Sequence, residues 1–229
     1  MKKHLICLAT LLSLTGVSVA FADYQEASAA LRSGDHAAAY KEFKYLADQG
    51  DARAQNMLGF MNDTGQGVPQ NYVEAMQWYT KAAGQGLMDA QYNIGVMHVK
   101  GKGVPQNYPE AIKWFRLAAE QGHVRAQNTL GFLYGSGQGV AQDPAEALKW
   151  YRKAAEQGFA PAQANLAVMY ANGEGVPLDL VQAHMWFNLS AAGGNADAQK
   201  ERDSIAERMT PAQLAEAQRL ATEWTLKRK

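Results

Sequence analysis

The chain has 229 residues, and its 22 Lys and Arg residues balance its 22 Asp and Glu residues, so the formal net charge is zero. This balance lacks the basic footprint that nucleic acids and anionic membranes require, so neither is an expected partner. The only cysteine, Cys7, lies in the apolar N-terminal run, which excludes a disulfide framework from the rest of the chain.

Residues 1–22 have the features of a secretory signal peptide. A basic start at positions 2 and 3 precedes the apolar run Leu5–Leu14, and Ala20 and Ala22 place small residues where signal peptidase requires them. The run is shorter than the roughly 20 residues that span a bilayer. We expect cleavage between Ala22 and Asp23, no membrane insertion afterwards, and a periplasmic or secreted protein.

Four blocks then repeat every 36 residues without an insertion: 51–86, 87–122, 123–158 and 159–194. A period of this length predicts stacked supersecondary units, none of which can bury its apolar face alone. The recurring features are an Ala-Gln pair near the start, a tryptophan near the end and a separating glycine: Ala54-Gln55, Ala90-Gln91, Ala126-Gln127 and Ala162-Gln163; Trp78, Trp114, Trp150 and Trp186; Gly50, Gly86, Gly122, Gly158 and Gly194.

Each block predicts two helices. In the first block, Ala54, Leu58 and Met61 share one face of a helix over about residues 51–62. Gly59 lies within that helix, where glycine costs about 1 kcal/mol relative to alanine. Its equivalents are also minimal (Gly95, Gly131 and Ala167), so we expect close approach of the paired helix at this position.

A glycine-rich turn over residues 65–69 leads to the second helix. Asn71 and Glu74 have the spacing of a capping box. The apolar face of this helix recurs at helical spacing, and Gly86 ends it: Ala75, Trp78, Tyr79, Ala82 and Ala83. Two helices joined by a short loop form an antiparallel hairpin, so the fold class is all-α.

The two ends are predicted to be degenerate capping units, residues 23–50 and 195–229. The first keeps a helix cap at Asp35 but has Glu42 at the tryptophan position. In the second, the Thr210–Gln213 segment caps a final helix whose outer face carries Glu216 and Arg219. Atypical polar ends are expected where a solenoid stops.

The repeated pattern Ala-Gln-x-x-Leu-Gly, Gly-x-Gly-Val and Glu-Ala-x-x-Trp-Tyr-x-x-Ala-Ala-x-x-Gly resembles the Sel-1-like repeat, a relative of the tetratricopeptide repeat. This resemblance implies a right-handed α/α superhelical solenoid of antiparallel helix pairs. It also implies a role in protein–protein interaction, with bacterial envelope members similar to adaptors and regulators. It implies no reaction.

The residues themselves predict no enzyme, no cofactor and no metal site. The loop Gly101–Val104 lacks the Gly-Lys-Ser/Thr ending of a P-loop, and no Ser-x-x-Lys occurs. The histidines are isolated, without metal-ligand spacing: His36, His98, His123 and His184. The tryptophan–tyrosine pairs share a helix face with alanines, which favours core packing over sugar stacking.

The binding surface is predicted from positions that vary between blocks on the first helix, opposite its fixed face. We call this set the first-helix stripe: Arg53, Asn56, Phe60, Asp89, Tyr92, Val96, Arg125, Asn128, Phe132, Ala164, Val168 and Asn172. By similarity to tetratricopeptide proteins, it should line a concave surface. Aromatic and arginine residues dominate interface hot spots. In the alternative interpretation, Phe60 and Phe132 only fill space between successive hairpins.

We therefore predict a monomeric envelope adaptor that binds a protein or peptide through this stripe. Two alternatives remain. The first is a cell-wall or β-lactam amide hydrolase, because a cysteine-rich branch of the resembling family is associated with that activity, although its disulfides are absent here. The second is a structural spacer that binds through its ends or its convex face. The sequence leaves open whether the ligand is a peptide, a folded protein or a glycan.

Overall fold

The computed structural model describes residues 24–228, and in this range the chain contains helices and turns but no strand. The signal-peptide prediction for residues 1–22 lies outside the described residues. The chain divides into two compact units, Met1–Gln106 and Asn107–Lys229. The all-α fold predicted from the repeats is confirmed.

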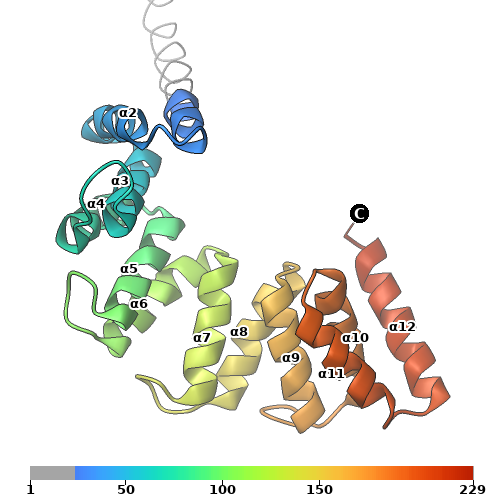
Figure 1. Cartoon of the computed structure of the whole chain (residues 1–229). Helices are drawn as coiled ribbons and strands as arrows, with labels where there is room; N and C mark the ends of the chain where they lie inside the picture. The colour runs from blue at the N-terminus through green and yellow to red at the C-terminus, as the bar shows by residue number, and fades with distance from the viewer. Residues whose placement is uncertain (1–23, 229) are drawn as a thin grey trace, which may run out of the picture. The chain divides into compact units, whose positions relative to one another are not determined.

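In the first unit, a helix over residues 24–32 is followed by four helices (Figure 1). These are α2 (His36–Asp48), α3 (Ala52–Thr64), α4 (Tyr72–Gly84) and α5 (Met88–Lys100). Each packs against the next, α2 on α3, α3 on α4 and α4 on α5. The helix predicted at about residues 51–62 begins one residue later and runs two residues further.

The second unit contains seven helices, of which α7 to α10 lie side by side in chain order (Figure 1). They are α6 (Tyr108–Glu120), α7 (Val124–Ser136), α8 (Pro144–Glu156), α9 (Ala160–Asn172), α10 (Leu180–Ala192), α11 (Ala196–Ala206) and α12 (Pro211–Leu226). Helices α11 and α12 both pack on α10. Thr210 caps the start of α12 as predicted, and its cap is a capping box with Gln213.

Most of the fixed aromatic positions lie in the core, whereas Trp114 is half-buried. Trp78, Tyr79, Trp150 and Tyr151 are all buried, as expected for packing residues and not for exposed sugar-stacking rings. In the N-terminal capping unit, Phe43 occupies the position equivalent to Tyr79 and is fully buried. The sequence prediction considered only its neighbour Glu42. The first hairpin therefore keeps a buried aromatic side chain although Glu42 stands at the tryptophan position.

The small residue in the first helix is explained by the aromatic ring opposite. A Cβ added at Gly59 would lie 2.5 Å from Cδ1 of Tyr79, and one added at Gly131 would lie 2.6 Å from Cδ1 of Tyr151. Both distances are far below van der Waals contact. The predicted close approach of the paired helices is confirmed at these two positions.

The Ala-Gln pair has a structural role that its recurrence alone did not reveal. The Gln55 side chain is buried, and its Nε2 donates to the Ala47 carbonyl oxygen at 3.2 Å, near the end of the preceding helix. Gln127 donates in the same way to the Ala119 carbonyl at 3.0 Å. Carbonyls at a helix end have no partner within the helix, so these glutamines join each first helix to the helix before it.

The predicted capping box of the second helix is wrong in one half. Asn71 Oδ1 accepts a hydrogen bond from the Glu74 amide at 3.1 Å, as predicted. The Asn71 amide, however, donates to the Asn62 carbonyl at 2.9 Å and is not available to Glu74. The Glu74 carboxylate instead accepts from Trp78 Nε1 at 3.4 Å. A hydrogen bond between the two helices of the hairpin, from Asn71 to Asn62, therefore replaces the predicted local bond from the Asn71 amide to the Glu74 side chain.

Candidate functional site

In the first unit, the first-helix stripe lies on α3 and α5. Phe60 is 37% exposed, while Tyr92 and Val96 are half-buried. Asp89 is exposed, and Asn56 is half-buried. Phe60 is therefore a surface residue of this unit, which argues against the interpretation that it only fills space.

Arg53 is less available than the sequence suggested. Its guanidinium lies 4.4 Å from the ring centroid of Tyr24, and Nη2 lies 3.2 Å from Oδ2 of Asp51. Burial is the main cause that raises the pKa of Tyr24, and the charge of Arg53 opposes that rise. Arg53 thus connects α3 to the helix over residues 24–32, and a partner would have to compete for it.

In the second unit, the stripe lies on α7 and α9. Phe132 is 51% exposed and Val168 is 40% exposed, whereas Ala164 and Asn128 are half-buried. Arg125 is exposed. Phe132 and Val168 together present apolar surface on neighbouring first helices, and α7 and α9 both pack against the α8 helix between them.

Two side-chain amide pairs that were not predicted from the sequence join successive first helices. Asn93 Nδ2 donates to Asn56 Oδ1 at 3.0 Å in the first unit, and Asn165 Nδ2 donates to Asn128 Oδ1 at 3.0 Å in the second. In both pairs the donor lies 37 residues after the acceptor. The recurrence of asparagine at positions 93 and 165 was the available signal.

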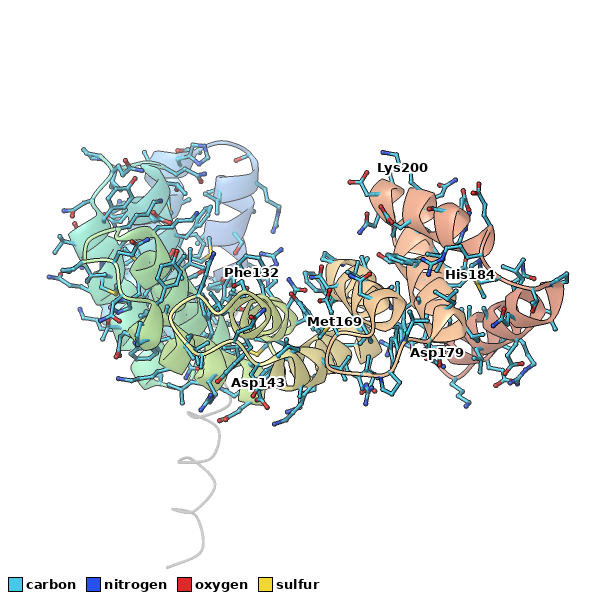
Figure 2. All side chains as sticks on the ribbon, turned by 90° about the horizontal axis from the view of Figure 1, so that it is seen from below. Phe132, Asp143, Met169, Asp179, His184 and Lys200 are labelled. Carbon is cyan, nitrogen blue, oxygen red and sulfur yellow. The ribbon has the colours of Figure 1, made fainter. Side chains whose placement is uncertain are left out.

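A cavity of about 300 Å³ opens beside Phe132 and Val168 in the second unit. Figure 2 marks Phe132 on α7 and Met169 on α9, which both line it. The Tyr151 ring and the Glu174 side chain contribute further to its wall. Burial and, to a smaller extent, the charge of Glu174 raise the pKa of Tyr151 to about 12, so its hydroxyl stays protonated.

Between residues 24 and 228, no group of three or more His, Cys, Asp or Glu side chains could hold a metal ion. In the same range, no helix has the length and apolar character needed to cross a membrane.

The sequence model of the Sel1 repeat matches residues 52–87, 89–123, 124–159 and 160–195, which is more than half of the chain. The chain belongs to the Sel1 repeat family. Sel1 repeat proteins are generally adaptors for protein interaction and non-enzymatic scaffolds. The α/α solenoid of antiparallel helix pairs that the repeats predicted is the fold of this family. Among curated proteins, none matches this chain.

Solved structures of other Sel1 repeat proteins are similar to it. The protective antigen c5321 of uropathogenic Escherichia coli is 33% identical with a TM-score of 0.79, over 91% of this chain and 46% of its own. This chain thus spans less than half of c5321. A Sel1 repeat protein from Oxalobacter formigenes is 37% identical, with a TM-score of 0.74, over 78% of this chain and 73% of its own. A putative Sel1 repeat protein from Klebsiella pneumoniae is 24% identical, with a TM-score of 0.54 over 82% of this chain and 93% of its own, and shows the shared fold alone.

Proposed function

We propose that this Sel1 repeat protein is an adaptor of the bacterial envelope that binds a protein or peptide through the first-helix stripe. The observation that carries the proposal is the exposure of large apolar side chains on the first helices, Phe60 in one unit and Phe132 and Val168 in the other. Apolar and aromatic side chains that a partner desolvates are the usual source of binding energy at an interface.

The amide pairs support a binding surface of defined shape. The hydrogen bonds from Asn93 to Asn56 and from Asn165 to Asn128 hold adjacent first helices together beside the exposed apolar side chains. A surface whose side chains are already held loses less conformational freedom when a partner binds. The resemblance to tetratricopeptide proteins predicts that this face is concave, which favours an extended peptide or a protruding segment.

The envelope location rests on the N-terminal sequence. The basic start, the short apolar run and the small residues at positions 20 and 22 are typical of a cleavable signal peptide. We propose that the mature protein acts as a monomer in the periplasm or outside the cell. No bound cofactor is part of the proposal.

Alanine substitution of three stripe aromatics, Phe60→Ala, Tyr92→Ala and Phe132→Ala, is expected to abolish partner capture. Mature protein would be immobilised, exposed to envelope extract and analysed by mass spectrometry. The lost contacts include large apolar groups, each of which contributes about 1–3 kcal/mol when buried at a hot spot. A specific protein should be retained by the native chain and lost by the variant, with circular dichroism confirming that the variant folds.

The matched control removes exposed side chains of similar size from the second helices: Tyr45→Ala on α2, Val73→Ala on α4 and Leu117→Ala on α6. This variant should capture the same protein as the native chain. If the control loses the partner while the stripe variant keeps it, the interface lies on the second helices, and the structural-spacer interpretation replaces the proposal.

A further inference from the structure

Each residue that lines the cavity in the second unit has an equivalent residue in the first unit, because the repeats have a constant length of 36 residues. Three residues that line the cavity are Gly135, Pro144 and Glu174. The residues 72 positions earlier, two repeats back, are Asp63, Tyr72 and Lys102. The two units can therefore be compared position by position within one chain.

In the first unit, the chain's own lysine occupies this position. Lys102 Nζ donates to Asp63 Oδ1 at 2.7 Å and lies 4.5 Å from the ring centroid of Tyr72. Both charged side chains are about three-quarters buried. The hydrogen bond to Asp63 is the main cause that raises the pKa of Lys102, so the lysine is charged at neutral pH.

In the second unit, none of these three groups is present. Glycine at 135 removes the carboxylate, proline at 144 removes the aromatic ring, and glutamate at 174 replaces the lysine with a group of opposite charge. The result is an open cavity of about 300 Å³ with a carboxylate in its wall. The first unit therefore has a lysine ammonium at this position, and the second unit has the Glu174 carboxylate.

The Glu174 side chain is exposed, and its hydrogen-bond partner is an amide, not a cation. Asn172 Nδ2 donates to Glu174 Oε1 at 2.8 Å, which holds the side chain. Within residues 24–228, no lysine or arginine forms an ion pair with Glu174. Its negative charge also acts on the buried Tyr151 hydroxyl at the same cavity. A cation from outside the chain would complete the site.

The apolar wall fits the stem of a long basic side chain. Phe132, Val168 and Met169 present carbon surface at the cavity, and a lysine stem can bury its methylene groups there while its ammonium stays at the polar edge. An apolar wall with a single carboxylate at its edge matches the chemistry of a lysine side chain.

We propose that this cavity receives a lysine side chain of the protein partner, with its methylene stem against Phe132, Val168 and Met169 and its ammonium on Glu174. This inference rests on the proposed adaptor function and names the chemistry that the second unit recognises. The exposed apolar side chains of the stripe would then contact the partner. The cavity would favour partner segments in which a lysine lies next to those contacts.

The test uses a capped pentapeptide of alanines with one central lysine, and a matched peptide with norleucine in place of lysine. Binding to the whole mature protein is followed through the Met169 methyl signal by NMR. We expect a saturable shift with the lysine peptide and about fivefold weaker binding of the norleucine peptide, which keeps the stem but lacks the ammonium. In Glu174→Gln, the dissociation constant should rise by about fivefold, the upper range for a partly exposed ion pair.

A second variant copies the first unit. Gly135→Asp combined with Glu174→Lys should rebuild the internal ion pair and remove the saturable shift, with circular dichroism checking the fold. Glu156→Gln, which removes an exposed carboxylate from α8 away from the cavity lining, should bind the lysine peptide as the native protein does.

Three results would overturn the lysine site: no saturable shift with the lysine peptide, equal binding of the norleucine peptide, or native affinity in Glu174→Gln. The adaptor proposal is tested separately. If the captured partner binds the Gly135→Asp/Glu174→Lys variant as tightly as the native chain but does not bind the stripe variant, the lysine site is wrong and the adaptor function stands.

Discussion

Replacing Gly103 by alanine is expected to destabilise the protein by about 3 kcal/mol. Gly103 has a φ of +68°, a conformation that costs an L-residue about 1–2 kcal/mol. An added Cβ would also lie 2.5 Å from the carbonyl oxygen of Tyr72 and 2.7 Å from its carbonyl carbon. These are backbone atoms at the start of α4, so relief requires moving a loop against a helix, a cost of about 1–3 kcal/mol.

Gly86→Ala separates the two contributions. Gly86 also has a positive φ, +86°, but an added Cβ would meet no atom within 4 Å. Its substitution should cost only the conformational part, about 1–2 kcal/mol. The free energies of unfolding would be measured by urea titration with circular dichroism. Equal losses in the two variants would show that the loop does not press on α4.

Gly131→Ala is expected to cost about 2 kcal/mol although alanine is the better helix former. The added Cβ would lie 2.6–2.8 Å from three carbon atoms of the Tyr151 ring, which is buried between helices. Overpacking of this kind costs about 1–3 kcal/mol and exceeds the helix-propensity gain. The buried Ala167 at the equivalent position of α9 shows that one more carbon fits where the surroundings are arranged for it.

Gly135→Ala is the matched control in the same helix. Its Cβ would lie 3.6 Å from the Ala147 Cβ, an ordinary contact, so the substitution should stabilise α7 by about 0.5 kcal/mol through helix propensity. Thermal unfolding of the two variants should therefore shift in opposite directions. A stabilised Gly131→Ala would mean that the Tyr151 ring moves freely, and the account of helix pairing would be wrong.

The helices, their pairing and the small residue at Gly59 could all be predicted from the sequence. Each depends on spacing along the chain, and the 36-residue period shows four times which positions must stay apolar or minimal. The residues of the stripe could be assigned to one helix face, but not their contacts, because a helical period tells which residues share a face and not what else touches them.

The predictions that needed correction concern contacts between elements distant in sequence. The Arg53 guanidinium lies over the Tyr24 ring, and the Asn71 backbone amide donates to Asn62 and not to Glu74, and neither contact could be predicted from local sequence. The cavity was missed for a related reason. In the first unit, Asp63 and Lys102 form an ion pair at the equivalent positions, whereas Gly135 and Glu174 cannot form one. Only the structure shows that these two positions are neighbours in space.

The most direct test of the proposed function is hydroxyl-radical footprinting of the chain with its captured partner. The proposal predicts that oxidation of Phe60 and Phe132, both exposed in the free protein, falls severalfold in the complex. Oxidation of Tyr45 and Leu117, exposed on the second helices, should stay unchanged. Protection of Tyr45 and Leu117 with unchanged Phe60 and Phe132 would contradict binding through the first-helix stripe.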